Sequence, residues 1–142
     1  MWKYGYTLET VAEPEKLWKL YSDVNSWPKW DRGIKDVTLE GTFSTGTHGK
    51  IKPSNQDWLE FTLTKVEPLM GFSDRTEIPG TDSTICFDHT ITSLPSGKTR
   101  IRHEVIITGE NSELIGKEIG PSLVSGIPEA MENIASLALA TE

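Results

Sequence analysis

Two histidines, His89 and His103, are the polar residues of this sequence whose spacing points most directly to chemistry. Each stands in a segment whose alternate residues are apolar, and these flanking residues are Ile85, Phe87, Ile91, Ile101, Val105 and Ile107. Alternate residues of a strand share one face, so both imidazoles are expected on the apolar face of a sheet. The short link Pro95-Ser96-Gly97 predicts a hairpin that places the two histidines opposite each other, with Cβ atoms about 5 Å apart.

Two imidazoles so placed could share a proton, hydrogen-bond a ligand carbonyl, or act as general acid and base. The alternative is that they are buried polar residues satisfied by each other or by water. Arg75 is a third candidate catalytic residue. Pointing inward it could anchor a carboxylate or an enolate, whereas pointing outward it would be a solvated charge, and the outward orientation is favoured.

Neither a metal site nor a cofactor is expected. The histidine pair lacks an obvious third metal ligand. The glycine-rich segment from Gly41 to Gly49 lacks the Lys-Ser/Thr of a phosphate loop and reads as a hairpin. Cys86 shares the outward parity of Asp88, so a nucleophilic role is not expected for it.

Length, composition and charge limit the classes of protein to which the chain can belong. A chain of 142 residues is expected to form one domain, residues 1–142. Its formal charge of −7 argues against nucleic acid and anionic membrane as partners, because both need clustered Lys and Arg. The lone cysteine, the lack of a signal-peptide pattern and the lack of a long apolar stretch favour a cytoplasmic protein without integral membrane association.

The periodicity changes three times along the chain. A strand is expected over Tyr4–Val11, then a helix from Pro14 to Val24 and a second, short helix over Lys29–Ile34. Period-two alternation then predicts about six strands, over Asp36–Leu39, Gly46–Ile51, Trp58–Val66, Gly71–Ile78, Ser83–Leu94 and Thr99–Thr108. A helical pattern follows Gly109 to the end of the chain. Segregated strands and helices indicate an α+β protein with an antiparallel sheet.

Glycines and prolines interrupt the first half of the last helix. We expect a break or kink near Gly120-Pro121 or near Gly126-Pro128, because proline inside a helix removes a hydrogen bond and clashes with the preceding turn. A helix that cannot lie flat on its sheet leaves room beneath it.

Four groups of residues follow one another along the chain in a specific order. They are Ala12, Pro14, Leu17 and Trp18 in the first helix; Asp23 with Trp27-Pro28-x-Trp30-Asp31; Gly41-x-Phe43-x-x-Gly46-Thr47-x-Gly49; and Val66-Glu67-Pro68. In this order the whole chain resembles the START-related, Bet v 1-like superfamily (SRPBCC), in its polyketide cyclase/dehydrase branch. The resemblance implies a helix-grip fold: a seven-stranded antiparallel sheet curved around a long C-terminal helix, with two short helices between strands 1 and 2 and a cavity inside. It does not imply one activity.

The function expected from these features is binding of an apolar or amphipathic small molecule, lipid-like or polyketide-like, between the sheet and the last helix. The residues expected to line the site are His89, His103, Phe87, Ile91, Val105, Leu59, Phe61, Leu63, Leu123, Ile127, Met131 and Trp30. One alternative is a cyclase or aromatase that uses His89, His103 and Arg75. A second is a protein-interaction module without a ligand. The sequence leaves the oligomeric state open.

The three tryptophans Trp18, Trp27 and Trp30 lie within thirteen residues and therefore form either a packed junction or a binding surface. The resemblance favours the junction, with Trp27 and Trp30 fixing the corner between the two short helices. Direct ligand contact is the lesser expectation for Trp30.

Overall fold

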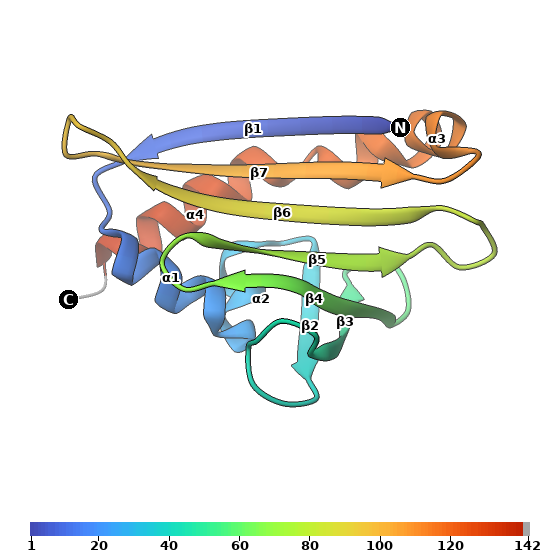
Figure 1. Cartoon of the computed structure of the whole chain (residues 1–142), viewed down its shortest axis with the longest axis horizontal. Coiled ribbons are helices and arrows are strands. Elements are labelled where there is room, and N and C mark those ends of the chain that lie inside the picture. The colour runs from blue at the N-terminus through green and yellow to red at the C-terminus, as the bar shows by residue number, and fades with distance from the viewer. Residues whose placement is uncertain (141–142) are drawn as a thin grey trace.

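One antiparallel sheet of seven strands organises the chain, in the order β1-β7-β6-β5-β4-β3-β2. The computed structural model describes residues 1–140. All helices lie on the same side of the sheet, behind it in Figure 1. The strands are β1 (Trp2–Thr10), β2 (Ile34–Leu39), β3 (His48–Pro53), β4 (Leu59–Glu67), β5 (Gly71–Glu77), β6 (Thr84–Ser93) and β7 (Thr99–Thr108). This is the expected α+β helix-grip architecture.

The first helical segment contains α1 (Pro14–Ser22), the 3-10 turn η1 (Val24–Ser26) and α2 (Trp27–Trp30). The prediction of a second helix over residues 29–34 was wrong, because α2 ends at Trp30 and β2 begins at Ile34. Pro28 occupies the first turn of α2, where its missing N–H leaves no bond unmade. The backbone turns extended at Asp31, which ends the helix.

The C-terminal helix is broken into α3 (Ser112–Val124) and α4 (Ile127–Ala140). The break falls at residues 125–126, the second of the two expected positions, while Pro121 lies inside α3 without ending it. The predicted continuation to the end of the chain includes residues 141 and 142, which lie outside the described residues. No helix within residues 1–140 is long and apolar enough to cross a membrane.

A bulge in β4 keeps the strand amphipathic. The pairing with β5 shifts between Leu63 and Lys65, so that Leu63 faces Asp74 while Val66 faces Phe72. Without the extra residue Val66 would have the outward parity of the strand, because one step along a strand reverses the face. The bulge therefore keeps both apolar side chains on the covered face.

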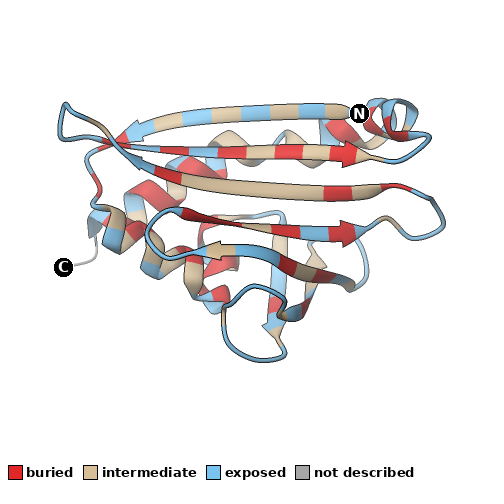
Figure 2. Cartoon of the chain, viewed as in Figure 1, coloured by how far each residue is buried: buried red, intermediate tan, exposed pale blue. Residues whose placement is uncertain are grey.

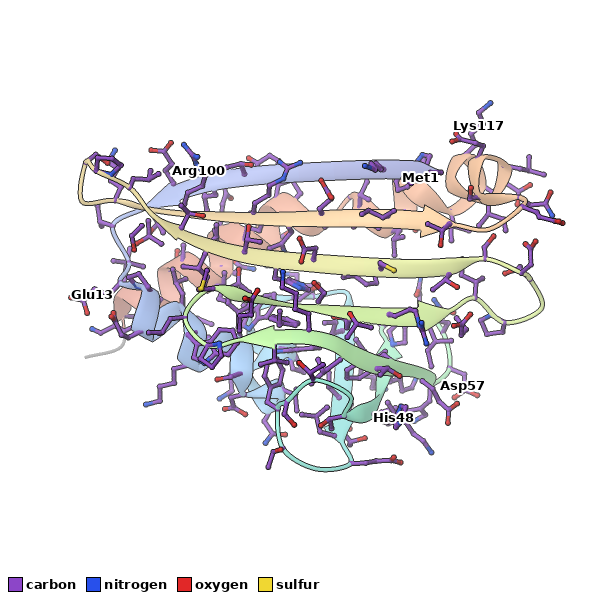
Figure 3. The ribbon with its side chains drawn as sticks, in the orientation of Figure 1. Met1, Glu13, His48, Asp57, Arg100 and Lys117 are labelled. Carbon is purple, nitrogen blue, oxygen red and sulfur yellow. The ribbon has the colours of Figure 1, made fainter. Side chains whose placement is uncertain are left out.

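Two glycines of α3 seat this helix on the first strand. A Cβ atom at Gly116 or at Gly120 would overlap the indole of Trp2. The amino group of Met1 also forms an ion pair with Glu113 at 2.9 Å, and Figure 3 shows Met1 beside this helix. The absence of these two side chains is thus what lets α3 approach the edge of the sheet.

The covered face holds two apolar clusters. The larger one is closed by the α1–α2 corner, where the Trp27 Nε1–H donates to the carbonyl of Tyr21 (2.9 Å) and the Trp30 Nε1–H donates to Ser26 Oγ (3.3 Å). Trp27 and Trp30 are buried, so they form the packed junction expected of them. Trp18 is only partly buried and packs its edge on Phe43. The smaller cluster lies under α3 and is described with the site.

Candidate functional site

His89 and His103 lie directly opposite each other on β6 and β7, as the hairpin link predicted. Their ring centroids are 4.6 Å apart and the rings meet edge to face, at 74°. Both side chains are on the covered face of the sheet, since Ile91 and Ile101, two residues along each strand, pair with each other in the core.

Tyr21 of α1 covers the pair from the helix side. Its hydroxyl and His103 Nε2 are 2.8 Å apart and form a buried hydrogen bond. His89 Nδ1 lies 3.3 Å from the carbonyl oxygen of Phe72. A carbonyl oxygen only accepts, so His89 Nδ1 carries the proton and its Nε2 is left with a free lone pair.

Burial keeps all three of these groups uncharged near neutral pH. Desolvation lowers the pKa of His89 to about 4. Desolvation, and then the neighbouring His89, lower the pKa of His103 well below its usual value. Burial raises the pKa of the Tyr21 hydroxyl above its ordinary value. The pair therefore acts as a neutral polar group in an apolar wall.

Aromatic side chains contact both histidines. Phe72 of β5 stacks on the His89 ring with a centroid distance of 4.0 Å and an angle of 10°. Trp30 of α2 meets the His103 ring edge to face, with 6.3 Å between the centroids. These contacts and those of Tyr21 hold the two imidazoles in fixed orientations.

The sheet face beside the histidine pair is incompletely covered. Phe87 and His89 face the helices but are only half-buried, whereas Val105 and Ile107 on β7 are fully buried. Figure 2 shows β6 as intermediate over most of its length, between two strands with many buried positions. From the helix side, the half-buried Leu123 and Ile127 pack against the same smaller cluster. Half-buried apolar side chains thus meet from the sheet and from the helix break.

The structure divides the residues that were expected to line a ligand site. Phe87, Leu123 and Ile127 are half-buried and pack against the smaller cluster, and His89 is half-buried beside Phe72 and Tyr21. Leu59 is half-buried farther along the sheet, opposite Ile51. The others are packed in the core, and they are His103, Ile91, Val105, Phe61, Leu63, Met131 and Trp30. Two surface hollows lie elsewhere: one at the start of α3 beside residues 80–82, the other along β3, β4 and β5, where it includes Arg75.

Arg75 is not part of this site. Its side chain is half-exposed on the outward side of β5 and forms an ion pair with Glu77, with 3.5 Å between Arg75 Nε and Glu77 Oε1. The inward parity of β5 belongs to Phe72, Asp74 and Thr76. The outer face of the sheet also carries ion pairs between Arg100 and Glu9 and between Arg102 and Glu104.

Asp74 is the functional candidate that sequence reasoning missed. It is 7% exposed and lies between its register partners Leu63 and Phe87. Desolvation, and then the charge of Asp88, raise its pKa to about 8. The parity of Phe72 and Thr76 was the available signal, because it places residue 74 on the covered face.

Metal binding and thiol chemistry are not supported by the described residues. Within residues 1–140 no three His, Cys, Asp or Glu side chains gather in a way that could hold a metal ion. Burial raises the pKa of the Cys86 thiol, which disfavours the reactive thiolate. His48, the third histidine, is exposed on β3 (Figure 3), and its Nδ1 lies 2.9 Å from Thr62 Oγ1.

Comparison with known proteins identifies the family. A family model described as polyketide cyclase / dehydrase and lipid transport matches residues 1–138. A search of curated protein sequences gives no significant match.

Solved structures of the same fold have distant sequences. Ara h 8.0201 superposes with a TM-score of 0.78 at 14% identity, over 99% of each chain. A hypothetical protein from Helicobacter pylori gives 0.78 at 10% identity, over 96% of this chain and 86% of that one. Norcoclaurine synthase from Thalictrum flavum, in complex with dopamine and hydroxybenzaldehyde, gives 0.75 at 14% identity, over 99% and 88%. At these identities the likeness establishes the fold.

Proposed function

Because the chain belongs to the polyketide cyclase/dehydrase and lipid transport family, in the Bet v 1-like superfamily, we propose that it binds an apolar or amphipathic small molecule of lipid or polyketide type. The site lies between β6 and the break that separates α3 from α4. The observation that carries the proposal is that Phe87, Leu123 and Ile127 pack against one cluster and are all only half-buried, with the half-buried His89 two residues from Phe87 on the same face of β6.

Burial of these apolar side chains would supply most of the affinity. Removing apolar surface from water contributes about 2.5 kcal/mol for each 100 Å². Phe87, Leu123 and Ile127 offer such surface from two sides, as pockets for small molecules commonly do. A closed core cannot gain in this way, which is why the larger cluster is the less suitable place.

A polar end of the ligand would meet His89. Its Nδ1–H is already committed to the Phe72 carbonyl, so its Nε2 is available to accept a hydrogen bond from a ligand hydroxyl. His103 is held by Tyr21 and packs on the edge of the His89 ring, so its proposed role is to position His89.

Entry of a ligand would require α3 to move. This helix ends at the 125–126 break, where a Cβ on Gly126 would meet nothing within 4 Å. The middle of the helix rests on Trp2 through Gly116 and Gly120. A small rotation of α3 about the break would widen the space over Phe87 without disturbing the larger cluster.

The test is binding of phenylnaphthylamine, a neutral apolar dye whose fluorescence rises when it leaves water. Leu123→Trp should fill the site and weaken binding about tenfold or more, whereas Leu114→Trp, on the exposed side of the same helix, should leave it unchanged. Ile127→Phe provides a smaller filling change if Leu123→Trp does not fold. Equal affinities in all four proteins, or no binding by the wild type, would contradict the proposal.

The geometry supports binding better than catalysis. A cyclase or aromatase needs a base whose pKa is near the working pH, and burial holds that of His89 at about 4. Arg75, the candidate for stabilising an enolate, points away from the site. The interaction-module alternative makes the opposite prediction for the same assay, since it expects no dye to bind.

A further inference from the structure

Asp74 is a carboxyl group with no protein partner in an apolar setting. It is 7% exposed and its register partners on the two neighbouring strands are Leu63 and Phe87. No hydrogen bond or ion pair joins its side chain to any of residues 1–140. Buried polar groups nearly always have a partner, so this one calls for an explanation.

The free oxygens of Asp74 lie on the accessible surface of the covered face. Within residues 1–140, every fully enclosed side-chain nitrogen or oxygen has a hydrogen-bond partner. The unpartnered carboxyl oxygens are therefore not fully enclosed. The side chain points inward on β5, beside the half-buried Phe87. A ligand would therefore reach these oxygens from the covered face of the sheet.

The charges around Asp74 do not offer it a counter-ion. Asp88 and Cys86 on β6 have outward parity, and the effect of Asp88 is to favour the protonated carboxyl. His89, on the inward face of β6, is neutral, and Leu63 is the partner on β4. Arg75, next in the chain, pairs with Glu77 on the outer side. Leu123 and Ile127, which pack against the same cluster as the Asp74 register partner Phe87, are apolar.

We propose that Asp74 is a specificity-determining residue that donates a hydrogen bond from its protonated carboxyl to an acceptor oxygen of a neutral ligand, such as a ketone. This rests on the proposed function and narrows it. A ligand carboxylate would bring a second acid into a site without a cation, so the site selects against fatty-acid anions.

A cationic amine is the competing partner for a carboxyl group. It would have to ionise Asp74 and bury both charges where no other group hydrogen-bonds them, and the desolvation cost of such a pair can exceed its attraction. A neutral acceptor leaves the site uncharged. The raised pKa of Asp74, about 8, keeps the donor proton in place at neutral pH.

The experiment measures displacement of phenylnaphthylamine by four probes of similar shape: acetylnaphthalene, ethylnaphthalene, naphthoate and aminomethylnaphthalene. The preference for the ketone is the ratio of its affinity to that of the hydrocarbon. This ratio should be about tenfold higher in the wild type than in Asp74→Leu. Asp74→Asn, which keeps a donor, should retain most of this preference. The preference should fall in the wild type as the pH rises through about 8, and stay constant in Asp74→Asn.

The outcomes separate the two proposals. Binding of ketone and hydrocarbon with the same ratio in wild type and Asp74→Leu would overturn the role of Asp74 while leaving ligand binding intact. Tightest binding of the amine or of naphthoate would also overturn it. If neither the dye nor any probe binds a folded wild type, both proposals fail. Because Asp74→Asn and Asp74→Leu remove a buried acid, neither is expected to unfold the protein.

Discussion

The hydroxyl of Tyr21 and Nε2 of His103 are 2.8 Å apart, although the two residues are 82 positions apart in the chain. The bond joins the first helix to the seventh strand at the centre of the covered face. It also fixes the imidazole that packs on His89. One buried hydrogen bond thus connects the tryptophan-rich corner to the candidate site.

Removing the Tyr21 hydroxyl should cost stability. Tyr21→Phe keeps the ring but leaves a buried nitrogen of His103 without a partner, which costs about 1–3 kcal/mol of unfolding free energy. Urea unfolding measures the change. Tyr6→Phe, on the strand beside His103, is the matched control and should change the free energy by less than about 0.5 kcal/mol. Equal effects of the two changes would show that the bond contributes nothing.

The histidine pair should make the protein sensitive to acid. The unfolded chain binds protons on histidine near pH 6.5, whereas His89 in the fold does so only near 4. Between these values the unfolded state binds more protons, so the pair's contribution to stability falls as the pH drops through this window.

The measurement compares urea unfolding at about pH 7 and about pH 4.5. His89→Phe, which keeps a ring stacked on Phe72, should reduce the loss in acid, while His48→Gln on the exposed strand should leave it in place. Asp74 acts in the opposite direction over the same range, so the variants are compared with each other. If His89→Phe loses as much unfolding free energy in acid as the wild type, the histidine pair is not the source of that loss.

Asp74 should destabilise the protein increasingly as the pH rises. Its pKa is about 8 in the fold against 3.8 as the ordinary value, so between these the folded state binds the extra proton and stability falls with increasing pH. Asp74→Asn should therefore raise the unfolding free energy at neutral pH by about 2–4 kcal/mol. Asp57→Asn, on an exposed loop, is the control (Figure 3). A destabilised Asp74→Asn would mean that the carboxylate has a partner in solution.

The contact between α3 and Trp2 should not tolerate a side chain at Gly120. Gly120→Ala would force its Cβ into the indole and cost about 1–3 kcal/mol, even though alanine favours a helix by about 1 kcal/mol over glycine. The same change at Gly126, which faces open space, should be neutral or slightly stabilising. Thermal unfolding of both variants checks this. A stable Gly120→Ala would mean that α3 does not rest on β1 in solution.

Strand and helix content could be predicted from the sequence because it depends on local periodicity. The alternation around His89 and His103 fixed their common face, and the three-residue link fixed their register, so the pair was predicted to the residue. The short α2 was misplaced because Trp27, Pro28 and Trp30 begin a helix that the backbone at Asp31 ends at once. No periodicity exists over so few residues.

The sequence by itself determined the fold class and the pairing of the two histidines, since both follow from side-chain alternation and a short turn. Only the tertiary structure decided that Tyr21 bonds His103, that Arg75 turns outward and that Asp74 is buried without a counter-charge. These depend on which helix covers which strand. Burial and partners across distant segments set the chemistry of a polar residue, and neither is encoded in the spacing of its neighbours.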